Sequence, residues 1–440
     1  MEIILLAGAL AIVAIFGWTV VAIRRTRAET AKARGDAQKT LERGALPPSL
    51  YPRIDLAKCI GCGACVKACP EYDVIGVLDG KAQVVNPTSC IGHGECMRAC
   101  PTDAIRLVLG TERRGVEIPL LAADYQTNVP GLYIVGELGG MGLIANAMSQ
   151  GLQCLRGIAK AAPQRLAGVH QVVIVGAGPA GIAAALVALE AKLDFVVLDQ
   201  ESIGGTVLQY PRHKIVMTRP VELPIYGKLK VSAVSKESLL EAWQDIVSKT
   251  GLEVRSNVKV DGVTRGEGGV FDLATTAGPL RAQRVVLALG RRGSPRKLGI
   301  PGEDRAKVTY RLLEPEGYSS KRCLVVGGGD SAIEAAVALG DAGAKVHLAY
   351  RGEVFDRIKP KNQQRLDAAV GAGRLTVLMK TQPKEVREAD VVLDQQGKRV
   401  ELPNDYVLVF AGGVLPTAFL EKAGVEVQTF KGDEFAPANA

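Results

Sequence analysis

The segment Val172-Val-Ile-Val-Gly-Ala-Gly-Pro-Ala-Gly181 decides the fold of the largest part of this chain. Its apolar start predicts a buried strand, its glycines a tight turn, and the Ala-rich sequence that follows a helix. Gly176 permits the turn, Gly178 lets the backbone approach a pyrophosphate, and Gly181 allows close helix packing. The next predicted strand ends at Asp199, whose carboxylate can accept a hydrogen bond from a ribose hydroxyl. Together these features predict a Rossmann-like dinucleotide-binding domain.

The same pattern recurs at Cys323-Leu-Val-Val-Gly-Gly-Gly-Asp-Ser-Ala332. Its fingerprint positions are taken by Gly327, Gly329 and Ala332. The strand that follows ends in Arg351 instead of an acid. Because arginine pairs with a ribose 2′-phosphate that a carboxylate would repel, this second domain is expected to prefer NADPH to NADH. Arg357 and Lys359 either add to the same pocket or form a solvated basic loop.

Seven of the nine cysteines lie between Cys59 and Cys100. The first run, Cys59-Ile-Gly-Cys-Gly-Ala-Cys-Val-Lys-Ala-Cys-Pro70, has the C-x2-C-x2-C-x3-C-P spacing of bacterial ferredoxins. In that spacing three thiolates converge on one iron–sulfur cluster and the fourth points to the neighbouring cluster. A [4Fe–4S] cluster is therefore expected on Cys59, Cys62, Cys65 and Cys100.

The second run, Cys90-Ile-Gly-His-Gly-Glu-Cys-Met-Arg-Ala-Cys-Pro101, has His93 where the second cysteine is expected. Cys69, Cys90 and Cys96 remain for the second cluster, which is either a [4Fe–4S] cluster with an imidazole ligand or a [3Fe–4S] cluster. A neutral imidazole should raise its potential, as in Rieske centres. The alternatives are a zinc site, which gives the Cys-Pro endings no role, and a disulfide scaffold, which suits small secreted domains.

Residues 3–23 form an unbroken apolar run, and Arg24, Arg25 and Arg27 follow it directly. About 20 apolar residues can cross a bilayer as one helix. The positive-inside rule then predicts an uncleaved single-pass anchor in the inner (cytoplasmic) membrane, with the catalytic domains in the cytoplasm. The alternative is a buried core helix. The net charge of +8 is diffuse, which favours a nearby anionic membrane surface and argues against nucleic acid as a partner.

The two fingerprints, with the strand ending at Gly290 between them, resemble the thioredoxin-reductase-like flavoproteins over most of residues 111–425. The resemblance implies FAD in the first domain and NADPH in the second. It also implies flavin contacts from the Gly204-Gly-Thr206 segment, here Gly205 and Thr206, and from residues 210–213. Residues 209–220 and the corner at Arg351 look most like the bacillithiol-disulfide-reductase branch.

The family's closing FAD segment is expected after residue 425 but resembles residues 129–151 instead, ahead of the first fingerprint. There Gly136 and Glu137 take the family's Gly-Asp positions, with glutamate replacing aspartate. This arrangement looks like a circular permutation, because the segment must lie beside the FAD strand wherever the chain is cut. The alternative is that residues 111–160 serve only as a linker.

These features predict an α/β chain with two Rossmann-like domains, a small α+β ferredoxin domain and one N-terminal transmembrane helix. The expected parts are an anchor (1–23), a charged stalk (24–50), a two-cluster ferredoxin domain (51–109), an FAD-binding domain (110–306, with 111–160 as the displaced segment) and an NAD(P)H-binding domain (307–440).

The expected function is that of a membrane-anchored oxidoreductase passing electrons between NADPH, FAD and two iron–sulfur clusters, because a flavin links hydride chemistry to single-electron carriers. The acceptor, a redox protein or a quinone-like molecule, the direction of flow and the oligomeric state stay open, with a homodimer as one candidate. The alternatives are a nucleotide-binding redox sensor and a disulfide reductase carrying a ferredoxin. A dithiol relay is disfavoured because Cys154 and Cys323 are isolated and predicted buried, and Ala180 stands where a thiol could act.

No side chain is assigned a catalytic role from the sequence. His213 is the histidine nearest the expected flavin loop, whereas His170 and His347 flank or occupy core strands.

Overall fold

The computed structural model describes residues 2–47, 50–71, 73–112, 115–140, 142–161, 164–210, 215–231, 233–291, 294–414 and 416–434. The chain divides into two compact units. One contains the described residues up to Thr111 together with Asp433 and Glu434, and the other runs from Glu112 to Gly432.

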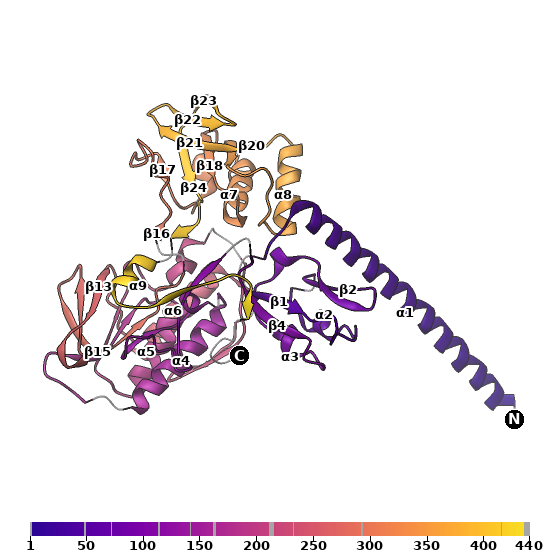
Figure 1. The fold of residues 1–440 in the computed structure, drawn as a ribbon, viewed down its shortest axis with the longest axis horizontal. Coiled ribbons are helices and arrows are strands. Elements are labelled where there is room, and N and C mark those ends of the chain that lie inside the picture. Colours follow the sequence, from indigo (N-terminus) through magenta and orange to yellow (C-terminus); the bar gives the residue numbers. More distant parts are fainter. Residues whose placement is uncertain are drawn as a thin grey trace. The chain divides into compact units, whose positions relative to one another are not determined.

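The smaller unit holds the cysteine runs between short strands and single-turn helices (Figure 1). An antiparallel sheet has the order β1-β4-β27, and an antiparallel hairpin pairs β2 with β3. Asp79 and Gly80 turn the hairpin with φ of 50° and 75°, as a two-residue type I′ turn requires. The elements of this unit are α1 (Glu2–Arg43), β1 (Leu50–Ile54), α2 (Ala64–Ala68), β2 (Ile75–Leu78), β3 (Lys81–Val84), α3 (Glu95–Arg98), β4 (Ile105–Leu109) and β27 (Asp433–Glu434).

The second half of α1 packs against the β2–β3 hairpin. Ala33 is 8% exposed. Its Cβ lies so close to Gly76 of β2 that a Cβ added to Gly76 would be only 2.5 Å from it. The Thr40 hydroxyl donates to the Val85 carbonyl. This differs from the solvated stalk expected over residues 24–50, because alanines spaced along one face of a charged helix let the hairpin approach closely.

The helix α1 also contains the run predicted to be a membrane anchor, residues 3–23, although the side chains of residues 1–11 lie outside the described set. None of the helices that the structure describes combines the length and the apolar character needed to span a bilayer.

The larger unit begins with a six-stranded sheet. Its strands β6, β15, β7 and β8 are parallel neighbours, and β14 and β13 continue the sheet antiparallel beyond β15. Continuous apolar strands suit a parallel sheet covered on both faces. The strands are β6 (Leu132–Ile134), β7 (His170–Val175), β8 (Phe195–Leu198), β13 (Val260–Arg265), β14 (Phe271–Thr275) and β15 (Leu280–Leu287).

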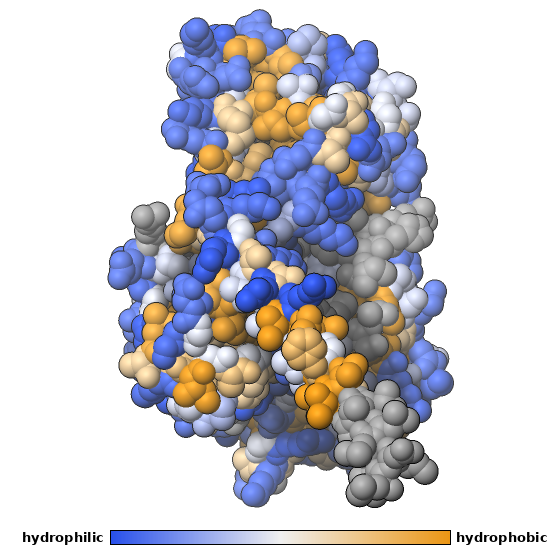
Figure 2. Space-filling view, turned by 90° about the vertical axis from the view of Figure 1, so that its right-hand side faces the viewer, coloured by the Kyte–Doolittle hydropathy of each residue, from blue (hydrophilic) through white to orange (hydrophobic). Residues whose placement is uncertain are grey.

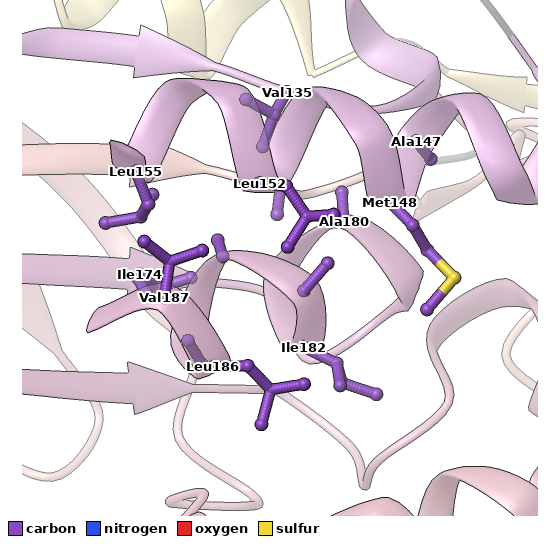
Figure 3. Packing of buried hydrophobic residues seen from close by; sticks show 14 of the residues in the cluster. Val135, Ala147, Met148, Leu152, Leu155, Ile174, Ala180, Ile182, Leu186 and Val187 are labelled. Carbon is purple, nitrogen blue, oxygen red and sulfur yellow. The ribbon is translucent and has the colours of Figure 1, made fainter. Parts of the chain in front are cut away.

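Residues 129–151 are part of this sheet and its helical layer. Strand β6 pairs in parallel with β15, and α4 (Ile144–Lys160) lies along α5 (Pro179–Glu190), the helix of the first fingerprint. Figure 3 shows Leu152 of α4 beside Ala180 of α5, and Leu155 of α4 beside Val187 of α5. A Cβ on Gly151 would lie 2.2 Å from the Ala180 carbonyl oxygen, so a glycine sets the spacing of the two helices. The segment is therefore a structural part of the domain and not only a linker.

A second parallel sheet has the order β17-β24-β18-β19-β20 and is packed by α7 and α8, with the antiparallel sheet β21-β22-β23 beside it in sequence (Figure 1). Its elements are β17 (Val308–Thr309), β18 (Arg322–Val326), α7 (Asp330–Asp341), β19 (Lys345–Tyr350), α8 (Pro360–Gly371), β20 (Leu375–Met379), β21 (Thr381–Val386), β22 (Asp390–Gln395), β23 (Lys398–Pro403) and β24 (Tyr406–Val409).

The last part of the chain leaves this second sheet. Helix α9 (Thr417–Lys422) packs its Leu420 into the core of the first sheet, and β26 (Val427–Phe430) pairs with β5 (Val116–Pro119). The sequence predicts that residues 307–440 form one NAD(P)H-binding domain, whereas α9 packs on the first sheet and β26 pairs with β5. Away from these cores, the face drawn in Figure 2 is mainly hydrophilic, with hydrophobic residues in separate patches.

Candidate functional site

The first glycine fingerprint opens on a cavity of about 420 Å³. The cavity brings together residues from the first fingerprint, the end of β8, the 204–206 segment, the end of β15 and the displaced segment. Eight sequence-predicted residues line it: Gly136, Glu137, Gly176, Gly178, Asp199, Gly205, Thr206 and Gly290.

Two glycines shape this cavity by close backbone contact. Gly176 has φ of 109°, and a Cβ there would lie 2.4 Å from the Ala288 carbonyl oxygen. A Cβ on Gly181 would lie 1.8 Å from the Gly176 carbonyl oxygen, so Gly181 lets α5 start directly against the turn. Gly178 caps α5 and leaves the helix N-terminus open to the cavity, an arrangement that suits a pyrophosphate.

Asp199 is 9% exposed and is held within the backbone of the site. Its Oδ2 accepts from the Ala177 N–H at 2.7 Å, and its Oδ1 accepts from the Glu201 N–H at 2.8 Å. Burial raises the pKa of Asp199, while these two hydrogen bonds favour its ionised form. Glu201, which the sequence reasoning missed, lines the same cavity. Its position two residues after Asp199, beyond the end of the same strand, could have indicated a second ribose-binding acid. Both carboxylates line the cavity where a ribose would bind.

The displaced segment closes one side of the cavity. The Gly136 N–H donates to Gln150 Oε1 at 2.7 Å, tying the turn to α4. Burial lowers the pKa of Arg291, and the nearby carboxylates of Glu137 and Glu117 oppose that shift. Glu137 therefore lies at the cavity with a cation in its surroundings.

The second fingerprint opens on a separate cavity of about 540 Å³. Gly327 and Gly329 line it, whereas Ala332 packs behind the turn, 2.9 Å from where a Gly327 Cβ would be. The cavity has a cationic rim formed by Arg296, Lys297, Arg351 and Arg357. Four basic residues lining the cavity beside a nucleotide-binding turn favour a ligand with an additional phosphate. Of these, the sequence reasoning missed Arg296 and Lys297, which lie on a connecting segment far from the fingerprint.

In the smaller unit, four cysteines gather around one small cavity. They are the four predicted for the first cluster: Cys59, Cys62, Cys65 and Cys100. The Ala82 N–H donates to Cys59 Sγ, and the Ala104 N–H donates to Cys100 Sγ, each at 3.3 Å. Burial raises the pKa of Cys65 to about 11, and the neighbouring thiols of Cys59 and Cys62 add to the shift. Iron binding at this site would therefore release protons.

A second set of thiols is more deeply buried. Cys69, Cys90 and Cys96 are 4%, 8% and 4% exposed. Burial raises the pKa of Cys90 to about 11 and that of Cys96 to about 12, with Cys69 close enough to contribute to both. Cys69 of the first run therefore lies near Cys90 and Cys96 of the second run.

His93 occupies the backbone position that corresponds to Cys62. Cys62 stands between Gly61 and Gly63, with φ of 71° and 72°, and His93 stands between Gly92 and Gly94, with φ of 76° and 79°. The His93 Nδ1 accepts from the Glu95 N–H at 3.3 Å. Burial lowers the pKa of His93, which favours the neutral ring that a metal ligand requires.

All nine cysteines are free of disulfides, which contradicts the disulfide alternative for these runs. In the part of the chain that the structure describes, no group of three or more His, Cys, Asp or Glu side chains forms a site that could hold a metal ion. The donor set nevertheless fits iron–sulfur clusters chemically, because thiols converge in two groups and backbone amides point at sulfur. The individual ligand assignments stay predictions.

The remaining candidate residues lie apart from these sites. Cys154 and Cys323 are 2% and 1% exposed in hydrophobic cores, as expected, and burial raises the pKa of both thiols. His170 interacts with Asp194 through Nδ1, and His347 lies in β19, where burial lowers its pKa. His213 lies outside the described residues.

Comparison with known proteins bears directly on this geometry. The family described as pyridine nucleotide-disulphide oxidoreductase matches residues 173–435, which include both fingerprints and both cavities' glycine loops. The chain belongs to this family. A 4Fe-4S dicluster domain matches residues 51–101, the part that contains both cysteine runs.

Relatives of this oxidoreductase have several activities. Bacilliredoxin reductase Bdr of Bacillus subtilis is 27% identical over 271 residues, or 60% of this chain and 84% of the relative. Two ferredoxin–NADP reductases are also similar. That of Ignicoccus hospitalis is 29% identical, covering 56% of this chain and 77% of its own. That of Gluconacetobacter diazotrophicus is 31% identical, covering 55% and 71%.

Solved structures give the same fold. Bacillithiol disulfide reductase Bdr of Bacillus cereus superposes with a TM-score of 0.52 at 26% identity, covering 58% of this chain and 82% of that one. The Staphylococcus aureus protein gives a TM-score of 0.52 at 24% identity, covering 58% and 80%. The chain is thus a flavin-dependent oxidoreductase with a 4Fe-4S ferredoxin module, related to ferredoxin–NADP reductase and Bdr.

Proposed function

We propose that the chain catalyses electron transfer between NADPH and a one-electron acceptor, with FAD in the first cavity and iron–sulfur clusters in the ferredoxin unit. The observation that carries the proposal is the presence of two glycine-loop cavities and a four-cysteine cavity in one polypeptide. When bound, FAD supplies the exchange between hydride and single electrons, and the clusters carry one electron each.

The cationic rim of the second cavity supports NADPH as the nucleotide. Arg351 follows β19 at the position where an acid would favour NADH, and Arg357 faces the same cavity. Lys359 is not among the residues that line this cavity. It precedes α8, and its backbone N–H donates to Asp330 at the start of α7.

The test uses holoprotein prepared anaerobically, with NADPH or NADH as donor and ferricyanide as an artificial one-electron acceptor. We expect sustained turnover and a kcat/KM for NADPH at least about tenfold above that for NADH, equivalent to about 1.4 kcal/mol of 2′-phosphate recognition. A single slow reduction without turnover would favour the redox-sensor alternative.

A disulfide reductase carrying a ferredoxin is the other alternative, and two names among the relatives motivate it. The burial of Cys154 and Cys323 argues against it, since neither thiol reaches solvent. Reduction of low-molecular-weight disulfides that is lost in Cys154→Ala or Cys323→Ala would support this alternative, and unchanged rates would exclude a role for these thiols.

We also propose His93 as a ligand of the second cluster, because it stands between two glycines of positive φ at the position that corresponds to Cys62. His93→Cys should lower the potential of that cluster, since thiolate adds negative charge, and His93→Ala should leave it with three thiolates. Low-temperature EPR of the dithionite-reduced protein is the measurement. Spectra that are identical to wild type for both variants would contradict ligation by His93.

The order of the FAD segments supports a circular permutation relative to the thioredoxin-reductase-like pattern. Strand β6 and α4 come before the first fingerprint in the chain, yet they adjoin β15 and α5. The family match begins only at residue 173, after this segment. A chain break moved in this way keeps the packing and changes only the connectivity.

For localisation, we propose a single-pass anchor at residues 3–23 in the inner membrane, with the catalytic units in the cytoplasm. The exposed apolar side chains of α1 point in all directions at 100° per residue, which suits lipid better than a one-sided protein contact. They are Ile12, Val13, Ile15, Phe16, Trp18, Val21 and Ile23. The acceptor at this location is a redox protein or a quinone-like molecule, and nucleic acid has no role.

Membrane fractionation tests the anchor. The full chain should stay in the membrane fraction after alkaline carbonate washing and be released by detergent, whereas a variant without residues 2–23 should be soluble. NADPH–ferricyanide activity of the two forms should be equal, because the removed residues precede both units' cofactor sites. A full-length protein found in the soluble fraction would contradict the anchor but not the enzymatic function.

A further inference from the structure

We propose that Asn362 is a positioning residue for the 2′-phosphate of NADPH, acting through the loop of residues 351–359. This loop joins β19 to α8 and carries Arg351 and Arg357 at the second cavity. The inference rests on the NADPH preference proposed above. It adds the part of the protein that keeps the two arginines in place.

The end of the loop is fixed to the fingerprint helix by partly buried hydrogen bonds. Asn362 is 6% exposed, and its Nδ2 donates to Asp330 Oδ1 at 2.7 Å and to Glu334 Oε1 at 3.1 Å. The Lys359 N–H donates to the same Asp330 Oδ1 at 2.9 Å. Because Asp330 directly follows Gly329, these bonds connect the loop to the nucleotide-binding turn itself.

The start of the loop is fixed by an aromatic contact. The Tyr350 ring is 8% exposed and stacks on Phe355, with ring centroids 5.0 Å apart and an interplanar angle of 12°. A Cβ on Gly328 would lie 2.1 Å from this ring, and one on Gly352 would lie 2.6 Å from it. The loop is therefore held at both ends against the same glycine turn.

An amide suits position 362 because it separates two carboxylates. Asp330 and Glu334 are one turn apart on α7, and the two hydrogens of the Asn362 NH₂ group serve one carboxylate each. Leucine has a similar size but no donor, and aspartate would add a third negative charge. Either change removes the donor that bridges the two carboxylates but keeps the Lys359 N–H bond to Asp330, so the end of the loop is held less firmly.

A loop that is already held in its binding geometry loses no conformational entropy when the ligand binds. The resulting gain in affinity applies to the 2′-phosphate, which is the part of the nucleotide that the loop is proposed to contact. Among the described residues, no hydrogen bond or ion pair occupies the Arg351 guanidinium, so it is available to a phosphate. Loss of the Asn362 bonds should thus weaken 2′-phosphate binding and spare the rest of the nucleotide.

The experiment compares binding of 2′,5′-ADP and 5′-AMP to the full-length holoprotein by calorimetry. Asn362→Leu should raise the Kd for 2′,5′-ADP by about tenfold or more, equivalent to about 1.4 kcal/mol, and leave the Kd for 5′-AMP within about twofold. In turnover, KM for NADPH should rise with kcat unchanged, and the constants for NADH should stay as in wild type.

Gln363→Leu is the matched control, since Gln363 is the next residue on α8 and its Nε2 donates to the exposed Asp367. It should change neither Kd. If Asn362→Leu fails to retain FAD, Asn362→Ser, which keeps one donor, should still weaken 2′,5′-ADP selectively. Equal weakening of both probes, or no change in either, would overturn the inference. A wild-type protein that binds both probes equally would overturn the NADPH preference itself, which separates the two failures.

Discussion

Gly151→Ala is expected to yield a protein that has lost most of its FAD. The added methyl would lie 2.2 Å from the Ala180 carbonyl oxygen, so α4 must move away from α5. Such overpacking costs about 1–3 kcal/mol, and here it acts on the helix that starts at the pyrophosphate-binding turn. The measurements are the flavin-to-protein ratio after purification and the free energy of unfolding by urea.

Gly157→Ala is the control, because Gly157 lies on the same helix and a methyl there would meet no atom within 4 Å beyond its own stretch of helix. It should keep its FAD and gain up to about 1 kcal/mol of stability from better helix propensity. A Gly151→Ala protein with full FAD content would contradict the close packing of the displaced segment on the first fingerprint.

Cys100→Ala is expected to remove the first cluster while leaving the flavin in place. Cys100 comes from the second cysteine run but lies at the cavity of the first, with Cys59, Cys62 and Cys65. Loss of one of four thiolates should lower iron and acid-labile sulfide by about half if both predicted clusters are present. The measurements are iron and sulfide per polypeptide and the EPR spectrum of the reduced protein.

Cys154→Ala provides the comparison, since that thiol is buried in the core of the larger unit. It should keep the full iron content and lose only about 1–2 kcal/mol of stability through the small cavity. Iron content that is unaffected in Cys100→Ala would contradict the assignment of this cysteine to the first cluster.

Local patterns made much of the two nucleotide sites predictable. Gly181 acts on the Gly176 carbonyl oxygen within the same turn, so its role can be read from the spacing, whereas the approach of Gly176 to Ala288 joins two distant segments. The position of Cys100 beside the first cysteine run was also predictable, because the Cys-Pro endings mark a fixed loop geometry. The occupation of both Asp199 oxygens by backbone amides was not predictable, since it depends on how the chain turns back at Ala177 and Glu201.

The sequence by itself determined that the chain has two glycine-turn nucleotide domains and a ferredoxin module, because strand, turn and ligand spacing are encoded within a few dozen residues. Only the tertiary structure decided which distant segments complete them. The α1 helix on the β2–β3 hairpin and the short Asp433–Glu434 strand on β4 depend on contacts between residues far apart in the chain. Such contacts are selected by shape and burial after the chain has closed on itself, and a short segment carries no pattern that names its partner.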